Sequence, residues 1–227
     1  MAVEAAATQE VFDGVMLGDG GLRPMNTSAF FSIDLSGVDH IDWLHIIKDT
    51  LSVLDVVTTP GHPRLNKGMS HGKVYYGCLL SSKSCPYLAY QYERWYPGGV
   101  KQVPGDVKLT PMLIANWFMG DGSSVWHQYK NMPGHKYVEA KFATHCYMRE
   151  DVELLRDLLE QLGINNPKVY PDGGHYFISV CNEEGAVELM HTIEPYIVPS
   201  YKYRIKYPVH NYRYNIKKEE SYGNRES

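Results

Sequence analysis

The sequence is poor in cysteine and has no long hydrophobic run. Four cysteines occur in 227 residues, and none forms a Cys-x-x-Cys pair, which argues against a zinc ribbon or a disulfide scaffold. No apolar run approaches the ~18 residues that cross a bilayer, so we expect no membrane association. The first ten residues contain two glutamates and no Lys or Arg, unlike a secretory signal or a transit peptide. We therefore expect an intracellular protein, made in a prokaryotic cytoplasm or in a mitochondrion or chloroplast that encodes it.

Positive charge is also scarce overall, because 22 basic residues face 26 acidic ones and the net charge is −4. Taken alone, this balance disfavours nucleic-acid binding. The charges are nevertheless grouped in blocks, whose net values are −7 over 1–60, +5 over 61–105, +1 over 106–147, −7 over 148–200 and +4 over 201–227. Two basic segments of this kind can form one positive face on a protein whose average charge is negative.

The chain contains an internal repeat. Phe12–Gly20 and Ile114–Gly122 match at an offset of 102 residues, and both are apolar helical runs that end in Gly-Asp-Gly. After each copy come two strands, Arg23–Asp34 with a turn near Asn26 and Val125–Met148 with a Pro-Gly turn. An amphipathic helix follows in each half, because Leu or another apolar residue recurs every three or four positions from Ile41 and from Val152. Repetition of this length is evidence of duplicated structural units.

Each half then continues with two more strands and a third helix. The strands are expected at 56–65 with 73–81 and at 167–171 with 175–181, and the helices at 84–96 and 183–196. The predicted fold class is α+β, with two pseudo-symmetric αββαββα halves whose antiparallel sheets carry helices on one face. We place the halves at 1–104 and 105–208, followed by a polar tail at 209–227. Thr110 and Pro111 supply an N-cap and a first-turn proline for the second motif helix.

The two Gly-Asp-Gly sequences predict a cation site. An aspartate at the C-terminal end of a helix opposes the helix dipole, so Asp19 and Asp121 each carry a local penalty that a bound cation would offset. Small residues four apart let two helix backbones approach closely, and the interface positions are Gly14 and Gly18 in one helix and Asn116 and Gly120 in the other. Such packing brings the two carboxylates together, and Mg²⁺ is the hard cation that this pair of oxygen ligands fits. Asn116 occupies a place where a glycine is expected, which predicts a weaker interface.

Together, these features resemble the LAGLIDADG homing endonucleases, in the single-chain branch with two motif copies. The resemblance is carried by Phe12–Gly20, Ile114–Gly122, the Leu109-Thr-Pro-Met lead-in, Gly99–Pro104 and Tyr196–Ile205, and it covers roughly residues 9–208. It implies a saddle of two sheets over a long double-stranded DNA site, with the motif helices between the halves. It also implies a monomer that cuts both strands in an intron-homing reaction and leaves short 3′ overhangs.

The resemblance assigns site residues to positions in this chain. Asp19 and Asp121 bind Mg²⁺, with Gly18 and Gly120 beside them in the metal site; Mn²⁺ is expected to substitute and Ca²⁺ to support binding only. Lys101 matches one basic residue that the family carries near the cleaved phosphates. The second is either Arg204 or Lys206, which would share a strand face with Lys202, and Arg204 is preferred. An arginine there would hold charge but would hardly exchange a proton.

Sequence readout is expected from alternate residues of the exposed sheet faces, which would enter the major groove. In the first half the candidates are Arg23, Ser28, Phe30, Ser32, Arg64, Lys67, Lys73 and Tyr75. In the second half they are Trp126, Gln128, Lys130, Lys136, Lys141, Lys168, Tyr170 and Lys202. Each lysine has the alternative of a solvated surface charge, and each aromatic residue that of a core position.

Three other functions stay open at this point. Members of the same family act as RNA maturases that help group I introns to fold, and intron RNA is therefore a second expected partner. A DNA-binding regulator without catalysis would be expected to lose at least one of the two aspartates, and neither is lost. A metal-binding structural module would not explain the basic blocks.

Overall fold

The computed structural model describes residues 2–70 and 73–209, and for residues 2–6, 69, 70, 73 and 75 the backbone alone. The first half consists of α1 (Ala2–Leu17), β1 (Gly21–Met25), β2 (Ser28–Ser36), α2 (Ile41–Val53), β3 (Arg64–Ser70), β4 (Lys73–Ser81) and α3 (Pro86–Trp95). The second consists of α4 (Pro111–Asp121), β5 (Gly122–Gln128), β6 (Lys136–Ala143), α5 (Arg149–Gln161), β7 (Lys168–Asp172), β8 (His175–Val180) and α6 (Glu183–Ile193). Three short 3₁₀ helices complete it: η1 (Pro97–Gly99), η2 (Glu194–Tyr196) and η3 (Pro199–Arg204).

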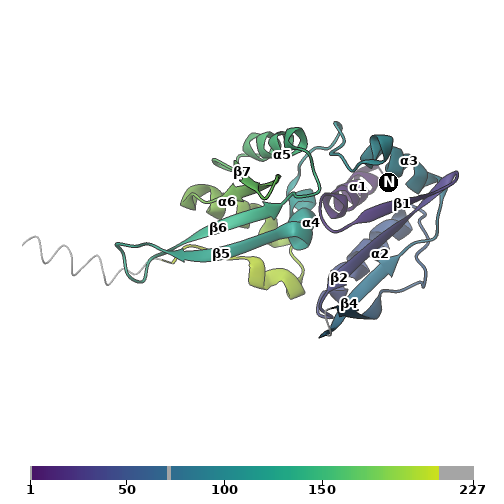
Figure 1. Ribbon diagram of the computed structural model, residues 1–227, viewed down its shortest axis with the longest axis horizontal. Helices are drawn as coiled ribbons and strands as arrows, with labels where there is room; N and C mark the ends of the chain where they lie inside the picture. The colour runs from purple at the N-terminus through teal and green to yellow at the C-terminus, as the bar shows by residue number, and fades with distance from the viewer. Residues whose placement is uncertain (1, 71–72, 210–227) are drawn as a thin grey trace, which may run out of the picture.

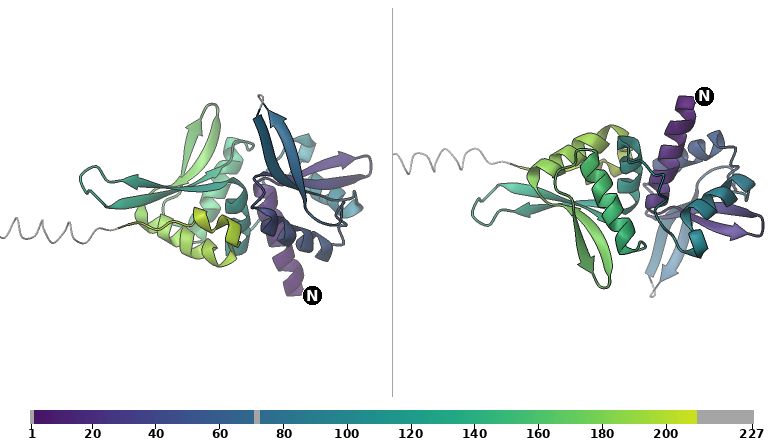
Figure 2. Two further views of the ribbon diagram at one scale, coloured as in Figure 1. Left: turned by 90° about the horizontal axis from the view of Figure 1, so that it is seen from below. Right: turned by 90° about the horizontal axis from the view of Figure 1, so that it is seen from above.

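The two halves have the same topology, which confirms the α+β fold with two αββαββα units. Each half has a four-stranded antiparallel sheet, ordered β1-β2-β4-β3 in the first and β5-β6-β8-β7 in the second. Helices α1 and α4 lie side by side in the middle of the molecule, with one sheet on either side (Figure 1). The β1–β2 and β5–β6 hairpins point in opposite directions at its two ends (Figure 2). Within the part of the chain that the structure describes, no helix is both long and apolar enough to cross a membrane.

Each sheet has one covered and one open face. In β2, Ala29, Phe31, Ile33 and Leu35 are buried beneath the helices, whereas the residues between them remain accessible. This alternation follows from the two-residue period of a strand. The open faces of the two sheets are therefore the surfaces available to a large ligand.

One predicted strand is misplaced. The segment 56–65 is mostly loop, and β3 runs instead from Arg64 to Ser70. Pro60 and Pro63 lie in that loop, and a proline has no N–H to donate to a sheet ladder. Only Thr58 forms a bridge there, to Ser82. Hydrophobic and β-branched residues around Val56 predicted a strand that the prolines prevent.

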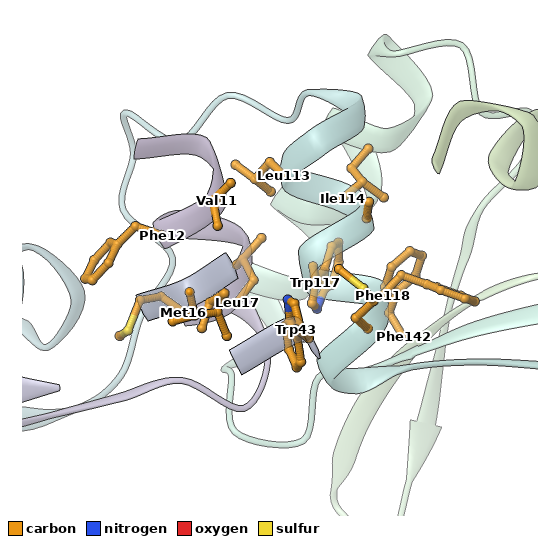
Figure 3. Close-up of a cluster of buried hydrophobic side chains, with 14 of the residues drawn as sticks. Val11, Phe12, Met16, Leu17, Trp43, Leu113, Ile114, Trp117, Phe118 and Phe142 are labelled. Atoms are coloured by element: carbon orange, nitrogen blue, oxygen red, sulfur yellow. The ribbon is translucent and has the colours of Figure 1, made fainter. Parts of the chain in front are cut away.

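The two motif helices pack with almost no space between their backbones. A Cβ atom added to Gly18 would lie 3.2 Å from the Cα of Gly120, and one added to Gly14 would lie 2.4 Å from the carbonyl oxygen of Leu113. Large buried side chains such as Trp117 surround this contact (Figure 3). The predicted N-cap of α4 is present, because Thr110 Oγ1 accepts a hydrogen bond of 3.2 Å from the Leu113 amide.

Asn116 does not leave a gap in this interface. It is buried, its Oδ1 accepts a hydrogen bond of 2.8 Å from Trp43 Nε1, and its Nδ2 donates to the carbonyl oxygen of Met112 at 2.9 Å. Trp43 lies in α2 of the first half, so the bond joins the two halves. The asparagine therefore adds a buried polar contact at the place where a glycine was expected.

Candidate functional site

The two aspartates meet at one end of the helix pair. Asp19 lies two residues after the end of α1, and Asp121 is the last residue of α4. A Cβ atom added to Gly120 would lie 3.0 Å from the Asp19 amide nitrogen and 3.5 Å from Asp19 Oδ2, so Asp19 packs against the residue before Asp121. Because Gly18 and Gly120 bring the backbones together, the carboxylates of two separate halves share one site.

Both carboxyl groups resist ionisation in this site. Burial raises the pKa of Asp121 to about 6, and the negative charge of Asp19 contributes in the same direction. Burial also raises the pKa of Asp19, against the opposing effect of Arg204, Lys101 and His40. Because burial disfavours the charged form of both carboxyl groups, a bound cation would stabilise that form.

The donor set fits a divalent metal that also binds a substrate. Among the described residues, no group of three or more His, Cys, Asp or Glu side chains could hold a metal ion by itself. Asp19 and Asp121 supply two hard oxygen donors, which is the usual number for Mg²⁺ where phosphate and water complete the coordination. The pair therefore fits a metal that binds together with a phosphate-containing ligand.

Lys101 is attached to the end of the first motif helix. Its Nζ donates to the carbonyl oxygens of Gly18 at 3.2 Å and of Gly20 at 3.1 Å, on either side of Asp19. Burial lowers the pKa of Lys101, while the negative charges around it, including Asp121 and Asp19, raise it. A cation at a helix C-terminus also satisfies carbonyl groups that lack partners within the helix.

Arg204 occupies the corresponding place in the second half. Its Nη1 donates to the carbonyl oxygens of Gly120 at 3.2 Å and Gly122 at 2.6 Å, which are the residues related to Gly18 and Gly20 by the offset of 102. It also donates to Phe118 and Met119. By position, Arg204 is the counterpart of Lys101.

Lys206 lies further away along the same segment. Its Nζ donates to the carbonyl oxygen of Ser124 at 2.5 Å and lies 5.3 Å from the Trp126 ring centroid. The expectation that Lys202, Arg204 and Lys206 share a strand face was wrong, because η3 ends at Arg204 and a 3₁₀ helix does not alternate its side chains as a strand does. Lys202 lies in η3 and is exposed.

The open face of the first sheet carries most of the residues predicted there. Strand register places Arg23 opposite Phe30, and Ser28 and Ser32 lie on the same face of β2. Arg64 of β3 pairs with Leu79 of β4, and Leu79 pairs on its other side with Asp34 of β2. Because paired residues share a face, Arg64 also lies on the open face. Lys73 and Tyr75 take register positions opposite Ser70 and Gly68, and their side chains lie outside the described part of the structure.

Lys67 was assigned to the wrong face. It pairs with Tyr76 and lies 6.0 Å from the centroid of that ring, whereas the open face of β3 carries Arg64 and Asn66. The displaced start of β3 explains the error, since the faces follow once the pairing with β4 is known.

In the second sheet, Lys141, Lys168 and Tyr170 lie on the open face. Lys141 pairs with Ser179, which pairs in turn with Lys168, and Tyr170 pairs with Phe177. Lys141 also lies 3.2 Å from Glu139 and over the Phe177 ring. Lys130 is exposed in the turn between β5 and β6.

Trp126, Gln128 and Lys136 lie on the opposite face, so their placement with Lys141 was wrong. Trp126 pairs with Val138, which is buried, and donates to the carbonyl oxygen of Tyr207. Gly122 lies on the covered side of β5, since a Cβ atom added to it would meet Phe118. Every second residue of β5 from Gly122 therefore lies on the covered face. The residues of β5 on the open face are Ser123, Val125 and His127.

Sequence reasoning missed several polar residues of the open faces. In the second half, His145 lies 3.2 Å from Asp172, and Asp121, Lys141 and His145 line a pocket of about 190 Å³. In the first half, Asn66 and Asp34 are joined by a hydrogen bond of 3.1 Å. Strand alternation would identify them only after the register is known.

Comparisons with known proteins found a matching family profile and related sequences. Residues 9–187 match the sequence profile of the LAGLIDADG DNA endonuclease family. The chain is 25% identical over 202 residues to the uncharacterized protein MJ1098 of Methanocaldococcus jannaschii, covering 89% of this chain and 74% of the relative. It is also 25% identical over 207 residues to the cytochrome b mRNA maturase bI2 of Saccharomyces cerevisiae, covering 85% of this chain and 45% of the maturase, so it spans less than half of that protein.

A solved structure shares the fold. The homing endonuclease I-WcaI, bound to its DNA recognition sequence, superimposes with a TM-score of 0.70 at 19% sequence identity, over 88% of this chain and 86% of that one. At 19% identity, this structural similarity shows a common fold and nothing further.

Proposed function

Because this chain belongs to the LAGLIDADG DNA endonuclease family, we propose that it is a site-specific endonuclease that cuts both strands of a long double-stranded DNA target and leaves short 3′ overhangs. The observation that carries the proposal is the site at the helix interface. It joins one carboxylate and one cation from each half, beneath two open sheet faces. Two related sets of groups are what cleavage of two antiparallel strands requires. Intron homing is the biological role that we attach to this activity.

Asp19 and Asp121 would hold the divalent metal, for which Mg²⁺ is the proposed ion and Mn²⁺ a substitute. Such a metal supplies activation of water and neutralisation of the scissile phosphate. Lys101 and Arg204 place positive charge beside the two acids, where it stabilises the negative charge that develops during phosphodiester hydrolysis. Their fixed attachment to the backbone of the motif helices holds this charge in place without reorganisation.

The open sheet faces would read the DNA sequence. Arg23, Arg64, Lys141 and Lys168 supply donors for phosphates or base edges, and the aromatic Tyr170 supplies an apolar surface. The helices α2, α5 and α6, which carry many of the acidic residues, lie on the covered faces of the sheets, so we expect positive potential to be concentrated on the open faces. Non-specific binding is therefore expected to be weak and strongly dependent on salt.

Selection of cleaved sites from a randomised DNA library tests the proposal. Wild-type protein with Mg²⁺ should enrich one long target and release ends with 3′ overhangs, whereas Asp19→Asn should bind that target without cutting it. The absence of any cut product, or equal cutting by Asp19→Asn, would refute it. Binding without cleavage by the wild type would favour a regulator instead.

Metal exchange and a lysine variant test the assigned roles. Replacing Mg²⁺ with Ca²⁺ should retain binding and abolish cleavage, and equally fast cleavage in Ca²⁺ would contradict the metal role. Lys101→Met should slow cleavage by about 10²–10³-fold, the usual effect of removing one preorganised donor, with nearly unchanged affinity. A collapse of binding would make Lys101 a DNA-positioning residue.

RNA maturase activity is the second candidate, because one relative is a cytochrome b mRNA maturase. The discriminating experiment measures splicing of a group I intron with wild-type protein and with Asp19→Asn. Splicing that is stimulated equally by both would support a maturase whose activity does not use the metal site. No stimulation by either would leave DNA cleavage as the function.

A further inference from the structure

The segment that carries Arg204 is held by the opposite half of the molecule. By sequence η3 belongs to the second half, yet it packs against α2 of the first. Asp42 in α2 accepts two hydrogen bonds from Ser200, one from its amide at 3.1 Å and one from its hydroxyl at 2.6 Å. The carboxylate thus fixes the first turn of η3 through both of its oxygens.

The N-terminal end of α2 and its N-cap residue His40 hold the next residue of η3 by ring contacts. The Tyr201 ring stacks on His40 with a centroid distance of 4.2 Å and meets the Trp43 ring edge-on at 5.4 Å. Tyr201 is almost completely buried. Its ring in turn lies 4.8 Å from the Arg204 guanidinium. A continuous set of contacts therefore leads from α2 through Ser200 and Tyr201 to Arg204.

A related arrangement holds Lys101. Asp151 in α5, 109 residues after Asp42, lies beside the backbone of Val103, two residues after Lys101: burial raises the pKa of Asp151, and the Val103 backbone lowers it. The same offset relates Ser32 to Lys141, the residues that pair with Gly21 and Ser123 after the two motifs. Asp42 and Asp151 are therefore equivalent in the repeat, and each contacts the cation-bearing segment that the other half contributes.

The charges follow the same crossed pattern. Arg204 exerts the largest favourable charge effect on Asp19, whereas Lys101 exerts the largest one on Asp121. Among the positive charges, the one that most favours ionisation of each acid is therefore the cation that the other half contributes. The helix that follows a given acid in the chain, α2 after Asp19 and α5 after Asp121, contacts the segment that carries that cation.

We propose that Asp42 and Asp151 are positioning residues, each of which sets the place of one catalytic cation and thereby the rate at which one DNA strand is cut. This inference rests on the proposed nuclease function. Asp42 acts on Arg204 through η3, and Asp151 acts on Lys101 through Val103. Neither carboxylate is proposed to contact DNA.

Strand-resolved nicking of a supercoiled plasmid that contains the selected target tests the proposal. Arg204→Met first identifies the strand that depends on Arg204. Asp42→Ala should slow cleavage of that same strand by about 10- to 100-fold, since a misplacement of about 1 Å costs this much in an enzyme, and should leave the other strand within about twofold. Asp151→Ala should slow the opposite strand. Asp42→Asn, which retains one acceptor oxygen, should fall between wild type and Asp42→Ala.

The matched control is Asp49→Ala, which removes an exposed carboxylate from the same helix. Asp49 forms an ion pair with the adjacent Lys48. It should leave both strands unaffected. Equal slowing of both strands by Asp42→Ala, which a general loss of stability would produce, would overturn the proposal, as would normal cleavage of both.

Backbone hydrogen exchange provides a measurement that needs no cleavage. Asp42→Ala should increase exchange across residues 199–205 by at least tenfold and leave the motif helices unchanged. Unchanged exchange in that segment would also overturn the proposal that Asp42 holds η3 in place. Wild-type protein that cuts no DNA would refute the nuclease, and the exchange measurement would still decide whether Asp42 positions Arg204.

Discussion

Replacing Asn116 with glycine distinguishes the sequence-based view of the helix interface from the structural one. Glycine restores the expected motif residue, so the sequence pattern predicts a tighter interface. The structure predicts the opposite, because Asn116 Oδ1 is the recorded acceptor for the buried Trp43 Nε1 at 2.8 Å.

The magnitude follows from the groups that would lose their partners. An indole N–H left unpaired in the core costs about 1–3 kcal/mol. The change from asparagine to glycine in a helix adds a few tenths of a kcal/mol. We expect the free energy of unfolding to fall by about 2–3 kcal/mol, which for a chain of this size lowers Tm by about 4–12 °C.

Urea unfolding of four proteins measures this effect as a double-mutant cycle: wild type, Asn116→Gly, Trp43→Phe and the double variant. Because phenylalanine has no N–H to satisfy, the cost of Asn116→Gly should fall by at least 1 kcal/mol in the Trp43→Phe background. A neutral or stabilising effect of Asn116→Gly, or the same cost in both backgrounds, would refute a stabilising bond between Asn116 and Trp43.

Three further changes test the packing and charges around the site. Gly14→Ala should lower the free energy of unfolding by about 2 kcal/mol, because the added methyl group overpacks against the second motif helix. Gly68→Ala, whose methyl group would meet nothing within 4 Å, should not show this loss. Similar losses for both variants in urea unfolding would contradict the close approach of the helices. Because folding raises the pKa of Asp121 from 3.8 to about 6, its stabilising contribution is complete below pH 3.8 and is lost as pH rises through 6. Asp121→Asn should therefore stabilise the metal-free protein in EDTA by up to about 3 kcal/mol at pH 7.5 and much less at pH 4, and a gain independent of pH would count against this. Arg94→Met should destabilise by about 3 kcal/mol, because it leaves the buried Asp13 without its ion-pair partner at 2.6 Å; a loss below 1 kcal/mol in urea unfolding would show that solvent compensates.

The internal repeat made most of the fold predictable. Two Gly-Asp-Gly copies at a fixed offset, each followed by the same order of elements, correctly indicated two αββαββα halves with the motif helices packed together. Helices α2 and α5 were predictable because their apolar residues recur at helical spacing. The strand 56–65 was not, since the prolines in this segment override its β-branched residues.

The candidate site was predictable only in part. The repeat identified Asp19 and Asp121 without a structure, and the resemblance to the family identified Lys101. The choice between Arg204 and Lys206 needed the fold, because both lie close together in one basic segment. Only the hydrogen bonds of Arg204 to Gly120 and Gly122 single it out as the counterpart of Lys101.

The sequence by itself determined what is repeated along the chain: the two halves, their helix periodicity and the paired acids. These properties are local, or recur at a constant offset, so a linear pattern contains them. The tertiary structure decided which face of each strand is open, as for Lys67 and Trp126, and which half holds each cation. Those outcomes depend on strand register and on contacts such as Asp42 with Ser200, 158 residues apart, which form only when the two halves pack against each other.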